Sequence, residues 1–538
     1  MPMKAFRLPV LAPWLIACVG VALYANSLWG AFILDDVAWI VRNPRIEKAW
    51  PPGEALSGTS RPLVQWTFAM NRALGNPNDV RGYHAVNMVV HILAGLALWG
   101  LARRVFPLML GEALDRSRAE AAGLAATLIW LAHPLHTESV TYVVQRAESM
   151  MGMFAFLTLY AMWRGHESDA GRMWYVVAVI ACWLAALTKM TMVTLPLVAL
   201  LMDRVFLAGD WDCVRRRRGW MHAGLFGSWL ILLWLTWATR HEWGDTAGYD
   251  VSGVTTLDYV LTQPEVILRY LRLSLWPTGL CLLYDWPFDR PAVAIWTASG
   301  ALVLMAVAGV WLYRRYPRQG VWWAWIILFL APTSSVIPLL HPIFEHRMYV
   351  PLVGLIFPIV ALVVLAGKRW PPAVHGVGFV IVTVLLAGAT IRRNADYRTE
   401  VSIWEDTVSK SKSNARARYA LGLAYATAHE PSKASEQFAR ALELRPDWAD
   451  PHHAWGQMLY QNGDVDGARD QFESALKSDP THAASWHDLG VIVREQGKLE
   501  LAARCFERAA FLSPEWMSAR SNWLRVRAEL DARPSGNE

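Results

Sequence analysis

Apolar stretches of about 20 residues recur along the chain from residue 10 to residue 390, and each is long enough to cross about 30 Å of hydrocarbon. Of the 538 residues, 54% are hydrophobic and only 18% are charged, with a mean hydropathy of +0.23. This composition excludes a disordered chain and a chain made only of soluble domains. The sequence therefore predicts a polytopic bundle of membrane-spanning helices.

We expect about eleven spans, because that number of apolar runs reaches the required length. The first run follows Lys4 and Arg7 and has no small-residue cleavage site after it, so we expect it to be retained, with the N-terminus in the cytoplasm. The remaining spans are predicted at residues 83–103, 120–138, 147–163, 173–188, 190–207, 220–239, 292–313, 320–337, 348–367 and 372–391. An odd count places the two termini on opposite sides of the membrane.

Basic residues mark the cytoplasmic side. In this topology four clusters face the cytoplasm, as the positive-inside rule requires: Arg103-Arg104, Arg215 to Arg218, Arg314-Arg315 and Lys368-Arg369. The net charge of +6 is thus explained by short loops between spans, and we expect no nucleic-acid partner. The five cysteines show neither zinc spacing nor a disulfide framework.

Three loops then face the other side: residues 31–82, 240–291 and 338–347. The second loop contains Val266 to Pro277, where Arg269 and Arg272 interrupt an apolar run at helical spacing, and this pattern predicts an amphipathic helix at the membrane interface. The alternative is a twelfth short span, which would turn the basic residues after it outward, so the interface helix is preferred.

A period of 34 residues appears after residue 394. Gly422, Gly456 and Gly490 are spaced by 34 residues, and the same spacing separates three phenylalanines: Phe438, Phe472 and Phe506. This is the tetratricopeptide (TPR) period, which predicts a solenoid of paired helices whose usual role is to bind a peptide or partner protein. We expect a membrane domain over residues 1–393, a linker helix over 394–412, three repeats and a capping helix over 413–531, and a tail over 532–538.

Two adjacent acids, Asp35 and Asp36, follow the first span and the apolar residues Phe32 to Leu34. Paired carboxylates at a membrane surface are electrostatically unfavourable, which points to a function as general base or as metal ligand. The alternative is an exposed acidic cap on a loop helix. An Asp pair can hold Mg²⁺ or Mn²⁺, but no third oxygen ligand is evident, so we expect no essential metal and no other cofactor.

Several segments carry a family resemblance. They are ILDDVAWIVRNPRI (Ile33 to Ile46), RPLVQWTFAMNRALG (Arg61 to Gly75), YHAVNMVVH (Tyr83 to His91), HPLHTESVTYVVQRAES (His133 to Ser149), TKMTMVTLPLVALLMD (Thr188 to Asp203), YLRLSLWPTGLCLLYDWP (Tyr270 to Pro287) and FEHRMYVPLVG (Phe344 to Gly354). In this order, and with the repeats after them, the chain resembles the transmembrane and TPR-containing O-mannosyltransferases and their bacterial relatives.

The resemblance implies an all-helical glycosyltransferase of the type C fold that takes its sugar from a polyprenyl-phosphate carrier on the non-cytoplasmic face. It also implies that an acid in the first outer loop is the catalytic base, which corresponds here to Asp35 or Asp36, with Asp35 preferred. A single displacement by a Ser or Thr hydroxyl would invert the sugar, and the departing phosphate would need cations rather than an acid.

Four cations lie at the outer ends of predicted spans, against the positive-inside tendency: Arg61, Arg146, Lys189 and Arg347. Because Arg binds phosphate oxygens bidentately and Lys adds a point charge, we expect these residues to bind the donor phosphate. The alternative for each is snorkelling or an ion pair, such as Arg146 with Glu148.

Further polar residues complete the predicted site. We expect the following side chains to form a polar network or to position the substrates: His84, His133, His136, Glu138, Asp285, Glu345 and His346. The HPLHTE segment could hold a metal, but Pro134 and the spacing do not reproduce a zinc-helix motif.

Taken together, these features predict a membrane glycosyltransferase in a bacterial inner membrane, with the active site and the TPR repeats in the periplasm. Its partners would be a polyprenyl-phosphate sugar, membrane lipid, and an acceptor protein bound by the repeats. Two alternatives remain: a transferase that modifies a glycan or lipid, and a non-catalytic membrane scaffold for the repeats. The scaffold does not explain paired acids and outward cations at span ends.

Overall fold

The computed structural model describes residues 8–77, 79–240 and 254–532, and these residues contain helices and no strand. The predicted all-helical fold class is therefore confirmed. Lys4, Arg7, residues 241–253 of the second outer loop and the end of the tail lie outside the described residues. The chain forms two compact units: Met1–Leu282 with Trp286–Thr399, and Leu283–Asp285 with Glu400–Glu538.

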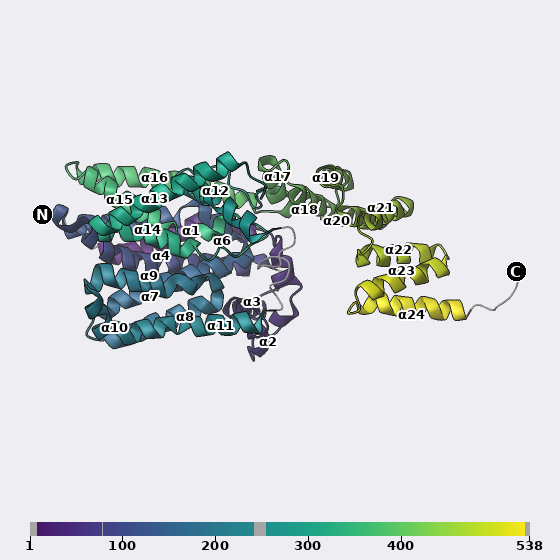
Figure 1. Ribbon diagram of the computed structural model, residues 1–538, viewed down its shortest axis with the longest axis horizontal. Coiled ribbons are helices and arrows are strands. Elements are labelled where there is room, and N and C mark those ends of the chain that lie inside the picture. The colour runs from purple at the N-terminus through teal and green to yellow at the C-terminus, as the bar shows by residue number, and fades with distance from the viewer. Residues whose placement is uncertain (1–7, 78, 241–253, 533–538) are drawn as a thin grey trace. The chain divides into compact units, whose positions relative to one another are not determined.

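The larger unit is a bundle of long helices (Figure 1). Its long helices are α1 (Leu8–Tyr24), α4 (Val80–Leu110), α5 (Arg116–Leu131), α7 (Arg146–Glu167), α8 (Gly171–Thr188), α9 (Leu195–Met202), α10 (Trp211–Phe226), α11 (Ser228–Ala238), α12 (Thr256–Leu275), α13 (Ala292–Arg315), α14 (Pro317–Leu330), α15 (Val353–Ala366) and α16 (Pro372–Asp396). Helix α4 packs against α1, α5 and α7.

Seven helical segments among the described residues are long and apolar enough to cross a membrane: Leu8–Trp29, Val80–Ala113, Gly171–Thr188, Met190–Ala208, Trp211–Ala238, Ala292–Arg315 and Pro372–Asp396. The predicted count of about eleven is not confirmed. The other four predicted spans correspond to α5, α7, α14 and α15, which are shorter or more polar. Pro134 follows the end of α5 and Pro332 follows the end of α14, where each predicted span stops being helical.

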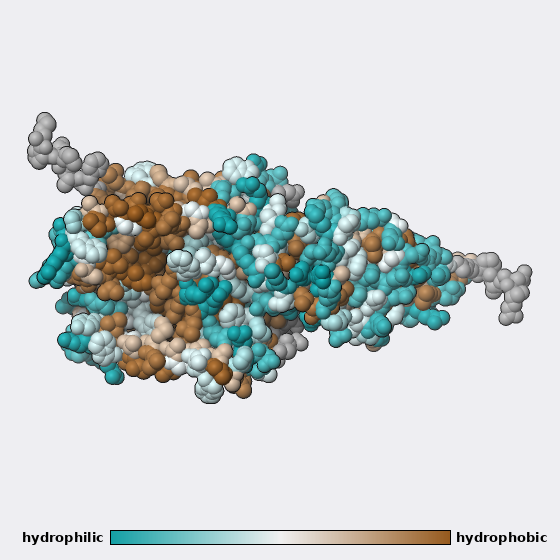
Figure 2. Space-filling view, turned by 90° about the horizontal axis from the view of Figure 1, so that it is seen from above, coloured by the Kyte–Doolittle hydropathy of each residue, from teal (hydrophilic) through white to brown (hydrophobic). Residues whose placement is uncertain are grey.

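The surface of the larger unit is apolar around its middle. Figure 2 shows a broad hydrophobic area on this unit with hydrophilic residues at both of its ends. Large side chains on α13 and α16 are exposed, among them Trp296 at 74% and Leu385 at 68%. Because a soluble protein rarely exposes so many contiguous apolar side chains, this surface is the one that faces lipid, and the chain is a multi-pass membrane protein.

Small residues allow the helices to approach closely inside the bundle. A methyl group on Gly95 of α4 would lie 2.9 Å from Leu131 on α5, and one on Gly152 of α7 would lie 2.4 Å from the Tyr349 ring. Such contacts are the usual basis of helix association in membranes, where apolar burial alone does not favour helix contact over lipid contact.

The short elements of the larger unit occur between the long helices. They are η1 (Ala25–Trp29), η2 (Val37–Val41), η3 (Pro44–Ile46), α2 (Gly53–Leu56), α3 (Pro62–Leu74), η4 (Gly111–Ala113), η5 (Pro134–His136), α6 (Thr137–Thr141), η6 (Val143–Gln145), η7 (Met190–Thr194), η8 (Asp203–Ala208) and η9 (Glu345–Met348). The segment after α1, the segment between α5 and α7, and η9 meet at one end of the bundle, which is where the candidate site lies.

The amphipathic segment predicted at Val266 to Pro277 is helical, as part of α12. The helix starts ten residues earlier than predicted because Thr255 and Asp258 form a reciprocal capping box at its N-terminus. Val266, Tyr270 and Leu273 are buried within the unit. Helix α12 is not among the seven candidate spans, and its place at the membrane interface stays a prediction.

The smaller unit begins with α17 (Glu400–Lys410) and continues as helix pairs. These are α18 (Ala415–Thr427) with α19 (Pro431–Leu444), α20 (Ala449–Gln461) with α21 (Val465–Ser478), and α22 (Ala483–Glu495) with α23 (Leu499–Leu512), followed by α24 (Met517–Asp531). Three pairs and a last helix are what the 34-residue period predicts.

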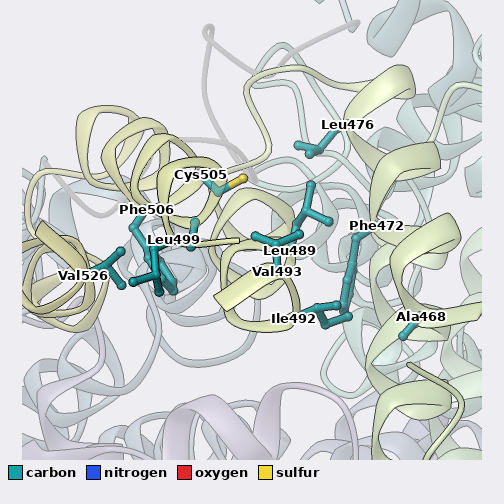
Figure 3. Close-up of a cluster of buried hydrophobic side chains, with 11 residues drawn as sticks. Ala468, Phe472, Leu476, Leu489, Ile492, Val493, Leu499, Cys505, Phe506 and Val526 are labelled. Carbon is teal, nitrogen blue, oxygen red and sulfur yellow. The ribbon is translucent and has the colours of Figure 1, made fainter. Parts of the chain in front are cut away.

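The repeated glycines and phenylalanines are packing partners. A methyl group on Gly456 would lie 2.7 Å from the Phe472 ring, and one on Gly490 would lie 2.9 Å from the Phe506 ring. In each pair the first helix carries the glycine and the second carries the ring. Figure 3 shows the resulting core, where Phe472 and Phe506 point among buried leucine, isoleucine and valine side chains.

Polar contacts join the first helices of successive repeats. Four of them connect residues 35 positions apart: His453 with Asp488 at 3.0 Å, Tyr460 with Glu495 at 2.7 Å, His487 with Asn522 at 3.0 Å, and Arg494 with Glu529 at 2.5 Å. Neighbouring repeats thus touch through a repeated set of side chains as well as through the apolar core, as expected for a solenoid whose units contact only their neighbours.

Candidate functional site

The two acids of the first outer loop, Asp35 and Asp36, differ in their exposure to solvent. Asp36 is fully buried, and both of its carboxylate oxygens accept backbone hydrogen bonds, from Ile33 N–H at 3.0 Å and from Val144 N–H at 2.7 Å. The second bond crosses more than a hundred residues of sequence and attaches the loop to the segment between α6 and α7. Asp36 is therefore a positioning residue for the loop.

Asp35 is the accessible acid of the pair. Its side chain is exposed, while its backbone N–H donates to the buried Tyr142 hydroxyl at 3.0 Å. Leu34 before it has φ of +48°, a left-handed conformation that a leucine rarely adopts and that costs on the order of 1–3 kcal/mol. Backbone strain of this kind persists only where the surroundings impose it, and here the hydrogen bonds of Asp35 N–H to Tyr142 and of the Asp36 carboxylate to Ile33 N–H and Val144 N–H hold the turn.

The environment shifts the pKa of both acids upward. Although Asp35 reaches solvent, the protein atoms packed around its carboxylate desolvate the charged form and raise its pKa, and the Arg61 charge and a hydrogen bond with Tyr142 act in the opposite direction. Burial also raises the pKa of Asp36, to about 8, although the backbone N–H groups of Ile33 and Val144 favour its ionised form. An exposed carboxylate with a raised pKa is better suited to accept a proton than an ordinary surface Asp.

Three of the four predicted phosphate-binding cations lie near one another. The charges of Arg61 and Arg347 both act on Lys189, and the Arg61 charge also acts on Asp35. Lys189 and Arg347 line one small cavity together with Glu148, to which Lys189 is paired. The guanidinium of Arg61 sits over the Trp39 ring, 5.3 Å from its centre.

Arg347 is held by backbone oxygens. Its two terminal nitrogens donate to Pro342 O at 2.6 Å and to His341 O at 2.8 Å. Among the residues that the structure describes, no acid forms an ion pair with Arg347, so its positive charge is available to an anion in the adjoining cavity.

Arg146 is enclosed by hydrogen-bond partners of its own. It is fully buried, with Nε donating to Asn87 at 2.6 Å and the terminal nitrogens donating to Thr67 at 3.2 Å and Tyr83 O at 3.0 Å. Its guanidinium also lies 4.5 Å from the Phe68 ring centre. The hydrogen bonds of Arg146 join α3, α4 and α7 beneath the site.

Glu138 and His346 connect two segments distant in sequence. The Glu138 carboxylate accepts from His346 N–H at 2.9 Å and contacts His346 Nδ1 at 2.8 Å, and both residues are buried. The neighbouring Glu345 accepts from Cys281 N–H at 2.5 Å. This network holds the segment 344–347, and with it Arg347, against the segment after α5.

The predicted histidines are buried near the same end. His133 Nε2 lies 3.1 Å from Ser274 O. His136 lies against the Trp130 and Tyr349 rings, with centre distances of 4.6 and 4.8 Å, and His84 lies against Gly30. Neither His84 nor His136 has a side-chain hydrogen bond to another described residue.

Asp285 belongs to the smaller unit, where its carboxylate accepts from the Ser413 hydroxyl at 2.6 Å. Within the described ranges no group of three or more His, Cys, Asp or Glu side chains surrounds a common point.

Sequence reasoning did not single out Tyr142, although it stands in a segment that carries the resemblance. Its hydroxyl is the group that fixes the backbone of Asp35. Glu148 was considered as the partner of Arg146, whereas its partner is Lys189. A tyrosine within a polar run between two predicted spans is the signal that could have pointed to Tyr142.

The chain matches two families. The family model for dolichyl-phosphate-mannose-protein mannosyltransferases matches residues 59–237, and the model for the tetratricopeptide repeat matches residues 453–515. The first match contains Arg61, Arg146 and Lys189, and the second covers α21, α22 and α23.

The names of two relatives agree with the first match. The chain is 23% identical over 458 residues to protein O-mannosyl-transferase F38B6.6 of Caenorhabditis elegans, covering 79% of this chain and 61% of the relative. It is 23% identical over 493 residues to protein O-mannosyl-transferase TMTC4 of Mus musculus, covering 77% and 64% respectively. The resemblance to transmembrane, TPR-containing O-mannosyltransferases is confirmed, and the chain spans about three fifths of the length of these two relatives.

Among solved structures, ArnT from Cupriavidus metallidurans bound to undecaprenyl phosphate is similar over 89% of this chain and 81% of its own, with 16% identity and a TM-score of 0.40. This score is too low to support an argument about the site.

Proposed function

We propose that this protein is a membrane glycosyltransferase that moves one sugar from a polyprenyl-phosphate donor to a Ser or Thr hydroxyl of an acceptor protein. The observation that carries the proposal is the accessible Asp35 beside the charge of Arg61, which also acts on Lys189, where the charge of Arg347 acts as well. A base beside a group of cations is what this reaction requires. The names of the relatives and of the matched family support mannose as the sugar and a protein as the acceptor.

Asp35 acts as general base. Its carboxylate takes the proton of the acceptor hydroxyl while that oxygen attacks the anomeric carbon from the face opposite the phosphate. The bond between the anomeric carbon and the phosphate oxygen breaks, and the polyprenyl phosphate leaves with the bonding electrons. One displacement inverts the anomeric configuration, and no acid is needed because the phosphate leaves as a stabilised anion.

Arg61, Lys189 and Arg347 stabilise the departing phosphate. Charge-assisted hydrogen bonds from guanidinium and ammonium groups are roughly twice as strong as neutral ones, and a partly enclosed site strengthens them further. We propose that these three side chains supply the positive charge and that no metal ion is required. Arg146 supports them indirectly, through the hydrogen bonds that hold α3, α4 and α7.

The TPR repeats select the acceptor. Solenoids of this kind present an extended concave surface for peptides, and the first helices of the repeats are ordered by the contacts between residues 35 positions apart. From the distribution of basic loops, we place the catalytic end and the repeats in the periplasm and the N-terminus in the cytoplasm of a bacterial cell.

The test compares intact masses of membrane and exported proteins from cells that carry the wild-type chain, Asp35→Asn or Glu47→Gln. Glu47 is an exposed acid of the same loop, so its variant removes a carboxylate without touching the proposed base. We expect a hexose-sized mass on specific proteins with wild type and Glu47→Gln, and its loss with Asp35→Asn. If no protein mass changes but extracted lipids or glycans do, the acceptor is not protein. If nothing changes, the bundle is an anchor and the proposal is wrong.

A further inference from the structure

A second cavity lies at the opposite end of the bundle from Asp35. It is an apolar groove of about 460 Å³ between α1, α5, α15 and α16, which is within the usual size range for a small-molecule site. Leu15 and Val19 of α1, Leu128 of α5 and Phe379 of α16 line it. We refer to this cavity as the lipid groove.

Basic side chains line the groove toward one end only. Arg118 stands near the start of α5, Lys368 follows α15, and His375 stands in the first turn of α16. The other ends of α5 and α16 reach the candidate site, where Asn394 contacts Thr141 and Leu23 O. The basic end of the groove therefore lies in the membrane leaflet opposite the candidate catalytic site.

The basic groups are only partly compensated. Arg118 pairs with Asp115 at 3.2 Å, whereas Lys368 has no ion pair with any residue in the described ranges. His375 stacks on Trp370, with ring centres 5.7 Å apart, and its Nε2 is buried without a hydrogen-bond partner in the described part of the chain. This nitrogen lies against Gly367, where an added Cβ would stand 2.4 Å from it, so His375 contributes its ring to the wall of the groove.

We propose that the lipid groove is a binding site for an anionic glycerophospholipid. One acyl chain lies along the apolar walls, and the phosphate lies between Arg118, Lys368 and His375. Charge complementarity supports this occupant. A zwitterionic lipid has no net charge, so its attraction to the uncompensated cations is weaker than that of an anionic lipid. The surrounding surface of α16 is apolar and exposed, so a lipid can enter sideways from the bilayer.

This site is separate from the reaction. It contains none of the residues assigned to donor binding or catalysis, and it stands whether or not the protein transfers a sugar. Its role is to fix α16, of which only 6% of the membrane-spanning window is buried against the protein itself. A lipid bound between α16 and α5 supplies contacts that the helix lacks.

The test uses the purified, delipidated full chain in detergent. Native mass spectrometry measures the retention of phosphatidylglycerol and of phosphatidylcholine with identical acyl chains. We expect a preference for phosphatidylglycerol on the order of tenfold in wild type, from two or more basic groups near the headgroup. Equal retention of the two lipids, or retention of neither, would overturn the proposal.

Matched variants locate the binding. Arg118→Ala/Lys368→Ala removes two groove cations, and Arg116→Ala/Arg369→Ala removes the same charge from neighbouring exposed positions that do not line the groove. We expect the preference to disappear in the first double variant only. If both double variants lose it equally, general surface charge is responsible and the groove is not the site.

A steric pair tests the apolar part. Gly376 lines the groove and Gly378 does not, and an added Cβ meets no atom within 4 Å at either position. Because both replacements gain the same helix propensity, Gly376→Leu and Gly378→Leu differ only in filling the groove. We expect Gly376→Leu alone to lower retention of both lipids several-fold. Unchanged retention in Gly376→Leu contradicts an acyl chain in the groove.

Discussion

Replacing Asp35 and Asp36 separately by asparagine distinguishes a base from a positioning residue. In Asp36→Asn, the amide oxygen can accept one of the two backbone N–H groups that the carboxylate now accepts, at 3.0 and 2.7 Å, while the amide nitrogen faces the other. One buried N–H is left unsatisfied, which costs about 1–3 kcal/mol. In Asp35→Asn the side chain is exposed and the backbone bond to Tyr142 remains, so stability changes by about 0.5 kcal/mol or less.

Asp36→Asn should therefore change mainly the unfolding temperature, and Asp35→Asn mainly the transfer rate. Asp36→Asn lowers the unfolding temperature in detergent, by about 2–4 °C per kcal/mol in domains of ordinary size, and leaves measurable transfer in the folded fraction. Asp35→Asn keeps the wild-type unfolding temperature and lowers the transfer rate by about 10²–10⁴, the usual contribution of a general base. Thermal unfolding of the purified protein and initial transfer rates in the same samples measure both effects. A stable, fully active Asp35→Asn would refute the assignment of Asp35 as base.

Three further predictions concern the cations, pH and the repeats. Arg61→Gln should raise KM for the donor by about 10- to 100-fold, from the loss of one charge-assisted hydrogen bond, and a KM equal to wild type would exclude Arg61 from phosphate binding. Because burial raises the pKa of Asp35, the transfer rate should begin to fall at a pH above the ordinary Asp pKa of about 4 as the pH is lowered. The Arg61 charge opposes this rise in pKa, so Arg61→Gln should move the loss of transfer activity to still higher pH in a pH–rate profile. Gly456→Ala should destabilise the smaller unit by about 1–3 kcal/mol, because its methyl group meets the Phe472 ring, and limited proteolysis of the full chain should then cut the repeats faster than in Lys477→Ala, an exposed control.

The repeats were predictable from sequence because their packing is local. Gly456 and Phe472 stand on neighbouring helices of one repeat, so the contact between them recurs with the 34-residue period. Seven of the predicted spans overlap helical segments that are long and apolar enough to cross a membrane, whereas the other four are not confirmed. Hydropathy does not report where Pro134 or Pro332 ends a helix, nor that the residues after Pro134 form short helical elements buried in the protein.

The division of roles between Asp35 and Asp36 could not be read from the sequence, because Val144 and Tyr142, which separate them, lie more than a hundred residues away. The alternative in which Arg146 pairs with Glu148 does not occur, for a local reason. Residues two apart on a helix do not face each other, so Arg146 turns toward Asn87 and Glu148 turns toward Lys189.

Consumption of the donor tests the central claim most directly, since it requires no knowledge of the acceptor. Membranes that contain equal amounts of wild type or Asp35→Asn would be given a labelled polyprenyl-phosphate sugar, and the loss of label from the lipid fraction would be followed over time. The account predicts rapid loss with wild type and loss at the rate of membranes without the protein with Asp35→Asn. Equal rates in both would contradict a sugar transfer that depends on Asp35.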